Sequence, residues 1–240
     1  ESHLALHKWL QAVYLLCSSK KGISTQQLKR TLEVDQKTAW FLGHRIRLGM
    51  ESGDLRPFGH GGGPVEVDET FIGRDPSKKL GVGYEHKMKV LTLIDRETGR
   101  SRSMVVDKLT IKDVTPILQA NIAKEAHVMT DQAGYYYYLG DHFAKHDVVN
   151  HAKDEYARKE GDLTITTNNL EGFFSVFKRG MKGTYQHCRK QHLHRYLAEF
   201  DFRYTNRIAR GVDDNLRTRI ALEGFKGKRL TYRGADSVVA

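Results

Sequence analysis

The stretch Thr166–Gly180, with the sequence TTNNLEGFFSVFKRG, has the pattern of a helix with one apolar side. At 3.6 residues per turn, its apolar residues follow the i, i+3, i+4, i+7 spacing that defines the buried face of an amphipathic helix. The sequence therefore predicts a helix that packs its aromatic side against a core. The residues on that side are Leu170, Phe173, Phe174, Phe177 and Met181.

A stripe of charge follows the border of this apolar side. Glu171 and Lys178 are seven residues apart and share a line on the helix, which Lys182 continues. Asn168 or Asn169 stands where an N-cap is expected. A carboxylate at the edge of a core and beside lysines fits a metal ligand that faces a phosphate. An ordinary surface helix with a solvated charge stripe explains the same pattern, so the rest of the chain has to decide.

The composition indicates a folded protein with a polyanionic partner. The 240 residues include 39 Lys and Arg against 29 Asp and Glu, which gives a formal charge of +10 and a pI near 9.5. Such an excess favours nucleic acid over an anionic membrane, and a basic soluble enzyme is the alternative. No apolar run approaches the roughly 20 residues of a membrane span, and no signal segment is visible, so we expect a cytoplasmic protein with no membrane partner. Cys17 and Cys188 lie far apart and give no sign of a disulfide framework or a zinc site.

Residues 4–50 have the spacing of three successive helices. Apolar periodicity predicts helices over residues 4–17, 23–32 and 36–50, with Ser24 or Thr25 capping the second and Asp35 the third. A short helix, a tight turn and a longer helix form the helix-turn-helix pattern, whose last helix enters the major groove of DNA. A three-helix cluster without DNA contact is the alternative. The polar face of the last helix offers Gln36, Lys37, Thr38, His44, Arg45 and Arg47, of which Lys37, Thr38, Arg45 and Arg47 are the predicted DNA-binding residues.

The run Gly59–Pro64, with the sequence GHGGGP, is too rich in glycine to hold a helix or strand interior together. We interpret it as a flexible linker. It separates a helix-turn-helix domain of residues 1–58 from a second domain of residues 65–210. The remaining residues, 211–240, are basic and are predicted to form a loose tail.

Strands and helices alternate in the second domain. Their order, β-β-β-α-β-α-β-α, is typical of a mixed five-stranded sheet flanked by helices, an α/β fold. It places Asp68 on the first strand, Asp131 directly after the fourth and Glu171 on the helix after the fifth. The predicted strands are 65–73, 87–95, 102–107, 126–130 and 147–151, and the predicted helices before residue 166 are 110–124 and 135–143.

Short motifs are spread along these predicted elements. They are KTAWF at 37–41 and HRIR at 44–47, VDET at 67–70, TD at 130–131, VNH at 149–151 with EY at 155–156, TN at 167–168 with EGF at 171–173, KRG at 178–180, GTY at 183–185 and YLAEFDFRY at 196–204. Together they resemble the Merlin-like insertion-sequence transposases of the DDE superfamily. The chain departs from that family in two ways. Thr166 stands where many members have His, and the Cys-rich zinc ribbon with which members commonly begin is absent.

The resemblance implies an RNase H-like fold, in which the three acidic positions converge at the centre of the sheet. It identifies Asp68, Asp131 and Glu171 as the catalytic carboxylates and metal ligands. It also identifies Lys178 as a lysine that contacts DNA, and Lys182 continues the same line. The residues that it suggests as support for the ligands are His151 and Asn168.

The chemistry of phosphodiester transfer explains why such a site needs carboxylates. Two divalent ions about 3.5 to 4 Å apart stabilise the attacking and leaving oxygens, and Mg²⁺ or Mn²⁺ prefers oxygen ligands. Asp68 is expected to bridge both ions, with Asp131 and Glu171 each holding one.

The expected protein is a homo-oligomer that acts on transposon ends and target DNA in the nucleoid of a bacterial cytoplasm. The alternatives are an RNase H-like nuclease that does not join DNA and a domesticated, non-catalytic DNA-binding regulator.

Some neighbours of these residues allow more than one interpretation. Asp131 has the alternative of capping the helix that follows it. Glu66 and Glu69 flank Asp68 but alternate to other directions along the strand, so we leave them out of the predicted site. The tyrosines at 135–138 either stack on unpaired bases or pack beneath the edge of the sheet.

Overall fold

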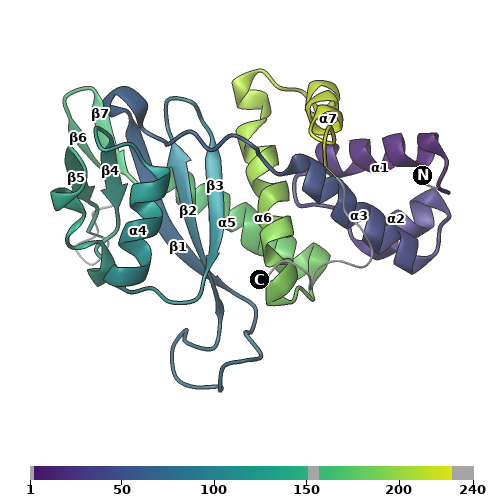
Figure 1. The fold of residues 1–240 in the computed structure, drawn as a ribbon, viewed down its shortest axis with the longest axis horizontal. Coiled ribbons are helices and arrows are strands. Elements are labelled where there is room, and N and C mark those ends of the chain that lie inside the picture. The colour runs from purple at the N-terminus through teal and green to yellow at the C-terminus, as the bar shows by residue number, and fades with distance from the viewer. Residues whose placement is uncertain (1–2, 151–156, 229–240) are drawn as a thin grey trace.

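A mixed five-stranded sheet forms the centre of the second half of the fold (Figure 1). The structure is a computed structural model that describes residues 3–150 and 157–228. The strand order is β3-β2-β1-β4-β5, in which β2 is antiparallel to both β1 and β3, and β4 is parallel to both β1 and β5. This order and these directions are those of the RNase H-like fold, as predicted. The strands are β1 (Pro64–Ile72), β2 (Met88–Asp95), β3 (Ser101–Val106), β4 (His127–Thr130) and β5 (Lys145–Val148).

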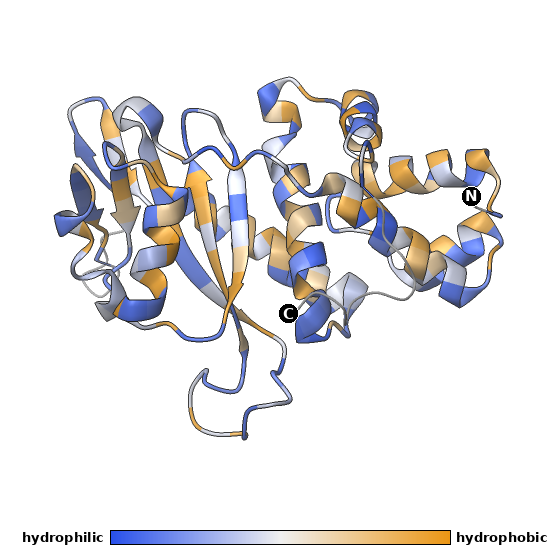
Figure 2. Cartoon of the chain, viewed as in Figure 1, coloured by the Kyte–Doolittle hydropathy of each residue, from blue (hydrophilic) through white to orange (hydrophobic). Residues whose placement is uncertain are grey.

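Helices cover both faces of the sheet. Residues of β1 alternate between the two cores, so that Val65 and Val67 pack on one side with Leu118 of α4. Ile72 belongs to the other side, where Phe177 of α5 packs with residues of α6. Figure 2 shows orange and blue residues on each of these helices, as amphipathic packing requires. None of the helices among residues 3–150 and 157–228 is both long and apolar enough to cross a bilayer. The bounds are α4 (Ile111–Asn121), α5 (Asn168–Gly180) and α6 (Lys190–Thr205).

Three local predictions are wrong or incomplete. Residues 135–143 do not form one helix but two short 3₁₀ turns, η2 (Gly134–Tyr136) and η3 (Leu139–Asp141). The fifth strand covers Lys145–Val148 rather than 147–151. A hairpin, β6 (Ala157–Glu160) and β7 (Leu163–Thr166), precedes α5. It was not predicted, because strands of four residues are too short to give a clear signal. A π-helical turn, η5 (Met181–Tyr185), extends α5.

The predicted three-helix cluster is present at the N-terminal end. Its helices are α1 (Leu6–Ser18), α2 (Thr25–Leu32) and α3 (Gln36–Met50). Both predicted caps form, since Ser24 Oγ accepts from Gln27 N at 3.1 Å and Asp35 Oδ1 accepts from Thr38 N at 2.9 Å.

The segment predicted as a loose tail contains a further helix, α7 (Asp214–Glu223). A 3₁₀ turn, η6 (Ile208–Arg210), precedes it. Ala221 of α7 is fully buried in the same cluster as Ala12 and Leu16 of α1. The tail prediction is therefore wrong for residues 214–223, because the helix completes the core of the N-terminal cluster.

The glycine-rich run is a fixed turn rather than a flexible linker. Phe58 forms a β-bridge with Ile122, and Gly59 N donates to Asp95 Oδ2 at 3.1 Å. A 3₁₀ turn, η1 (His60–Gly62), follows. Gly59 has a positive φ of 72°, and a Cβ at this position would lie 2.4 Å from Cβ of Ala126. Only glycine meets both constraints.

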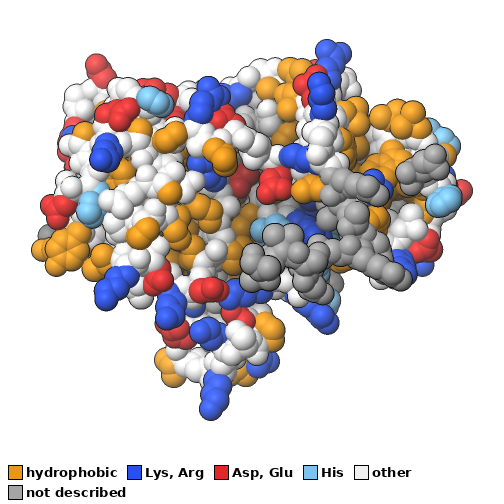
Figure 3. All heavy atoms as spheres, viewed as in Figure 1, with side chains coloured by type: hydrophobic (Ala, Val, Ile, Leu, Met, Phe, Trp, Pro, Cys, Tyr) orange, Lys and Arg blue, Asp and Glu red, His pale blue; other side chains and the backbone are white. Residues whose placement is uncertain are grey.

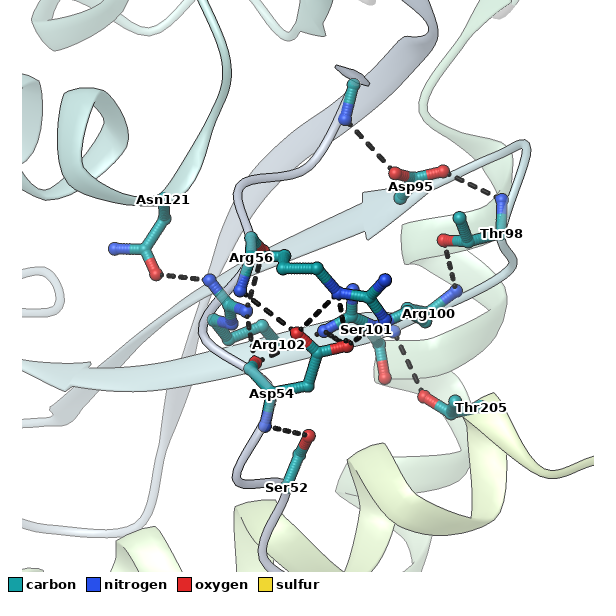
Figure 4. Close-up of polar contacts among 11 residues, drawn as sticks. Ser52, Asp54, Arg56, Asp95, Thr98, Arg100, Ser101, Arg102, Asn121 and Thr205 are labelled. Atoms are coloured by element: carbon teal, nitrogen blue, oxygen red, sulfur yellow. Dashed lines mark hydrogen bonds and ion pairs between the residues drawn. The ribbon is translucent and has the colours of Figure 1, made fainter.

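The preceding segment is also tied to the sheet, as Figure 4 shows. The carboxylate of Asp54 pairs with Arg56 at 2.7 Å and with Arg100 at 3.1 Å. Arg102 of β3 donates to the carbonyl of Asp54 at 2.8 Å and to Oδ1 of Asn121 at 2.7 Å. The connection between the helical cluster and the sheet is therefore held by polar contacts along its length.

Changing Gly59 to Ala is expected to lower the free energy of unfolding by about 2 to 3 kcal/mol, because left-handed strain and a steric clash add. Gly61 is the matched control. It has the same φ of 72°, but a Cβ added there would have no neighbouring atom within 4 Å. Gly61→Ala should therefore cost only about 1 kcal/mol. Urea unfolding of both variants measures the difference, and equal losses would contradict a packed turn.

Candidate active site

Three acidic side chains lie together where β1 passes the end of β4. Ligand oxygens of Asp68, Glu69 and Asp131 all lie within 4.8 Å of one another. The parallel pairing explains this, because Glu66 stands opposite Met129 and two further residues in each strand bring Asp68 level with Asp131. The sheet thus brings together two of the three predicted carboxylates from distant parts of the sequence.

The environment of Asp68 disfavours a negative charge. Burial is the main cause that raises the pKa of Asp68 to about 8, and the nearby charges of Glu69 and Asp131 raise it further. A hydrogen bond from Glu69 N to Asp68 Oδ1, at 2.7 Å, acts in the opposite direction. Because the ionised cluster is unfavourable by itself, a bound divalent cation would stabilise it.

Glu171, the third predicted carboxylate, is exposed on the first turn of α5. It does not belong to the group whose ligand oxygens lie within 4.8 Å of one another. Its charge nevertheless contributes to the raised pKa of Asp68, which places it within electrostatic range of the cluster. Glu171 and Asp68 share the α5 side of the sheet, since β1 alternates between faces.

Glu69 is the third acidic residue of the cluster, although it was left out of the site predicted from the sequence. Along β1 it follows Val65 and Val67 on the side that faces α4. Its Oε2 accepts a hydrogen bond from Tyr136 Oη at 2.8 Å, while burial raises the pKa of Glu69. An acidic residue in line with apolar neighbours on a strand needs a buried partner, and that signal was present in the sequence.

Asp131 does not cap a helix. The N-cap position of the following turn, η2, is occupied by Ala133. Asp131 Oδ1 instead accepts from Ala133 N at 3.0 Å, which tightens the turn after β4. The capping alternative is therefore wrong, and the turn fixes the orientation of the Asp131 carboxylate.

The comparison with known families agrees with this geometry. Residues 61–205 match the family model described as the ISXO2-like transposase domain, which is more than half of the chain. The chain belongs to the ISXO2-like transposase family.

Other comparisons add little to this assignment. Among curated proteins, none matches the transposase chain significantly in sequence. A solved structure, the Drosophila P element transposase strand transfer complex, resembles it with 10% sequence identity and a TM-score of 0.31. The alignment covers 93% of this chain and 64% of that chain, so the transposase spans just under two thirds of its length. No functional conclusion rests on a likeness at this TM-score.

The buried carboxylate of Glu66 on β1 binds α5, the helix of the transposase that carries Glu171. Glu66 is fully buried and pairs with Arg96 at 2.6 Å. Its carboxylate also accepts from Asn169 Nδ2 at 2.7 Å and from Leu170 N at 3.2 Å, which belong to the first turn of α5. Arg96 in turn donates to the carbonyl of Thr166 at 2.8 Å. The first turn that carries Glu171 is therefore positioned by a residue two places before Asp68.

The predicted capping of α5 by an asparagine is wrong. The helix begins at Asn168, its N-cap residue is Thr167, and no side chain forms the cap bond. Thr166 Oγ1 accepts from Asn168 N at 3.2 Å instead. Glu66 of β1 accepts a hydrogen bond from Leu170 N and so satisfies one backbone N–H group in the first turn of α5. The sequence pattern of the helix cannot show this contact.

The two predicted DNA-contacting lysines lie at the end of the same helix. Lys178 is half-buried in the last turn of α5, and Lys182 is exposed in η5. Neither lysine forms an ion pair with a carboxylate within residues 3–150 and 157–228. Their charges are therefore not neutralised by the described part of the transposase.

The predicted DNA-binding residues of α3 divide into two groups. Lys37 is exposed and Thr38 is half-buried, near the start of the helix. Arg45 is half-buried with its guanidinium 4.8 Å from the centroid of the Trp9 ring. Arg47 is only 4% exposed and pairs with Glu199 at 2.7 Å, so its prediction as a DNA contact is wrong. His44 is fully buried as well.

The charged guanidinium of Arg47 is buried and forms part of a group of interacting side chains inside the protein. Glu199 of α6 also pairs with Arg203 and accepts a hydrogen bond from Tyr185 Oη. The Arg47 guanidinium lies 4.2 Å from the ring centroid of Tyr196. This buried group joins α3 to α6 and to η5. Sequence periodicity missed it because the partner, Glu199, is 152 residues away.

The tyrosine row has two environments. Tyr136 is buried and binds Glu69, whereas Tyr137 is 78% and Tyr138 51% exposed. Packing thus holds for Tyr136 and for Tyr135, which is half-buried against the same core, and the two others present aromatic surface close to the turn that follows Asp131. His151, predicted to support the metal ligands, lies outside the described residues.

Proposed function

We propose that this chain is a DNA transposase of the Merlin-like DDE group that cleaves at transposon ends and joins them to target DNA. The observation that carries the proposal is the carboxylate cluster of Asp68, Glu69 and Asp131, whose repulsion a divalent cation relieves. Membership of the transposase family supplies the class of reaction. The excess of basic residues supports a polyanionic substrate.

The donor set fits Mg²⁺ or Mn²⁺, since it consists of carboxylate oxygens. Asp68, Asp131 and Glu171 would hold two ions. When bound, the ions stabilise the attacking and leaving oxygens at phosphorus and lower the pKa of the attacking water or hydroxyl. Glu69, held by Tyr136, adds negative charge beside Asp68 and so strengthens the attraction of the cluster for a cation.

Basic residues outside the cluster would hold the DNA. Lys178 in the last turn of α5 and Lys182 in η5 would neutralise phosphates. Lys37, Thr38 and Arg45 on α3 are the remaining candidates for duplex contact. Asn168 and His151 remain proposed supports of the metal ligands. Figure 3 shows Lys and Arg side chains spread over both the sheet and the helical part on one face.

The proposed assembly is a homo-oligomer that brings two transposon ends together. It would act in the bacterial cytoplasm, on chromosomal DNA of the nucleoid. Both steps of the reaction are in-line displacements at phosphorus. In the first, water frees a 3′ hydroxyl at the element end, and in the second that hydroxyl attacks target DNA.

A joining assay tests the proposal. A duplex with a pre-cut 3′ end is incubated with plasmid and Mg²⁺, and the expected result is a covalently joined product that disappears with EDTA. Cleavage without joining would instead favour a nuclease. Sequence-specific binding without either reaction would favour a non-catalytic regulator.

A further inference from the structure

A pocket of about 380 Å³ opens beside the N-terminus of α5, and three arginines line it. We call it the arginine pocket. Arg96 follows β2, whereas Arg207 and Arg210 come from the segment after α6. The other polar side chains in the lining include Thr164, Thr166 and Asn169. None of the three arginines belongs to the predicted site.

Backbone carbonyls hold two of these arginines in place. Arg207 Nη1 donates to the carbonyls of Tyr204 at 2.6 Å and Gly99 at 3.1 Å. Arg210 donates through Nη1 to the carbonyl of Glu97 at 3.0 Å and through Nη2 to that of Arg96 at 2.9 Å. Carbonyls orient a guanidinium without neutralising it, and each guanidinium has five N–H donors. Within residues 3–150 and 157–228, neither Arg207 nor Arg210 pairs with a carboxylate.

Two carboxylates lie near the pocket, and each already has hydrogen-bond or ion-pair partners. Glu66 is buried and pairs with Arg96. Asp95 accepts from Gly59 N at 3.1 Å and from Thr98 N at 2.9 Å, and Figure 4 shows it between those two groups. Because Glu66 neutralises Arg96, the two guanidiniums of Arg207 and Arg210 against the carboxylate of Asp95 leave the pocket with a positive balance, which suits an anion.

The β2–β3 turn leaves room for Arg210. Gly99 has a φ of 68°, and a Cβ there would lie 2.2 Å from Nε of Arg210. Glycine at this position therefore serves both the turn and the arginine that crosses it. The guanidinium of Arg210 is held against backbone carbonyls although the side chain is exposed.

The arginine pocket lies at a distance from Asp68 that suits one DNA strand. Asp68 pairs with Thr92, four residues before Arg96 on the neighbouring strand. At about 3.3 Å per residue this is roughly 13 Å along the sheet. Each strand of a duplex carries one phosphate per 3.4 Å of axis, so the separation corresponds to about four nucleotides. Glu66 and Asp68 alternate to the same face, on which α5 and the pocket also lie.

We propose that the arginine pocket binds a backbone phosphate of the substrate DNA a few nucleotides from the bond that is cut. The inference rests on the proposed function, because it takes Asp68 as the reaction centre. Arg207 and Arg210 would contact the phosphate oxygens with their remaining N–H groups, whereas Arg96, whose charge is paired with Glu66, forms part of the pocket wall. The contact is to the phosphate and is therefore independent of sequence.

The test is the salt dependence of duplex binding. The double variant R207Q/R210Q should lower the slope of log Kd against log salt by about 1, since the loss of one phosphate contact removes about 0.9. R207K/R210K keeps both charges and should retain most of the slope. R56Q is the control, because Arg56 is exposed but neutralised by Asp54 at 2.7 Å. Thermal unfolding checks that each variant folds, and R210Q alone, at an exposed side chain, repeats the test should the double variant unfold.

The outcomes separate this inference from the proposed function. An unchanged slope in a folded R207Q/R210Q protein overturns the proposal that the pocket binds a DNA phosphate, even if the wild type joins DNA. A reduced slope together with wild-type protein that does not join DNA upholds the pocket and overturns the transposase proposal. Inorganic phosphate at matched ionic strength is a further arm. Thermal stabilisation by phosphate that is lost in the variant, with an unchanged DNA slope, would mean a free-anion site and overturn the DNA contact.

Discussion

Asp68→Asn is expected to abolish DNA joining, with a loss on the order of 10³-fold or more, because several kcal/mol of charge stabilisation depend on the ions that Asp68 would hold. The same change should raise the melting temperature of the metal-free protein. It removes a charge that burial and the neighbouring Glu69 and Asp131 make unfavourable. A variant that is both inactive and more stable is the mark of a site built for a cation.

The pH dependence of stability has a defined sign. The pKa of Asp68 is raised to about 8 in the folded protein, so the folded state binds this proton more tightly than the unfolded chain does. The contribution of Asp68 to stability is complete below about pH 4 and is lost as the pH rises through about 8. Melts in EDTA at pH 5 and pH 8 should show this loss in the wild type and not in Asp68→Asn. Mg²⁺ should restore stability at pH 8 in the wild type alone.

Asp162→Asn is the matched control, since Asp162 is an exposed carboxylate between β6 and β7. It should change neither joining nor the response to Mg²⁺. Full joining activity in Asp68→Asn, or wild-type melts that ignore both pH and Mg²⁺, would falsify the proposed metal site.

Glu66→Gln is expected to lower the free energy of unfolding by about 3 to 5 kcal/mol, because it leaves the largely buried guanidinium of Arg96 without a counter-charge. It should also reduce joining, since Glu66 binds the first turn of α5 on which Glu171 stands. The effect on activity is indirect, so Glu66 is a positioning residue. Urea unfolding gives the first quantity and the joining assay the second.

Two comparisons sharpen this prediction. Glu160→Gln removes the carboxylate of a solvent-exposed pair, in which Lys145 lies at 2.7 Å, and should cost less than about 1 kcal/mol. Glu66→Gln combined with Arg96→Met should cost less than the two single changes together, because no unpaired charge remains. Additive losses in that double-mutant cycle would show that the pair is not coupled.

The sequence predicted the fold well where patterns are local. Alternation and helical spacing predicted four strands of the sheet closely and the fifth with its start two residues late, and Ser24 and Asp35 identified two helix starts that the structure confirms. The resemblance to the DDE transposases, through the fold that it implies, then predicted that Asp68 and Asp131 lie near each other. The alternation of β1 is also what led to Glu69 being left out, although Tyr136 holds it within the cluster.

Predictions failed where tertiary partners decide. From the helix pattern Arg47 was predicted to be a polar surface residue, but it is buried and forms an ion pair with Glu199 of α6. The run Gly59–Pro64 reads as a linker, yet contacts with Asp95 and Ala126 hold it. The helix α7 was hidden in a basic segment because its apolar side is narrow, with Ala221 in the core. None of these partners is close in sequence.

The buried pair of Arg47 and Glu199 also constrains how the protein is made. Helices α1 to α3 leave the ribosome before α6, and the carboxylate that Arg47 needs is encoded 152 residues later. At about 5 to 20 residues per second, roughly 8 to 30 s pass before it is synthesised. A longer delay, roughly 10 to 40 s, applies to α7, which completes the core around α1 and whose Arg217 follows its partner Cys17 by 200 residues. The nascent helices α1 to α3 therefore cannot complete their core before α6 and α7 have been synthesised. The helical cluster and the sheet then reach their final stability together.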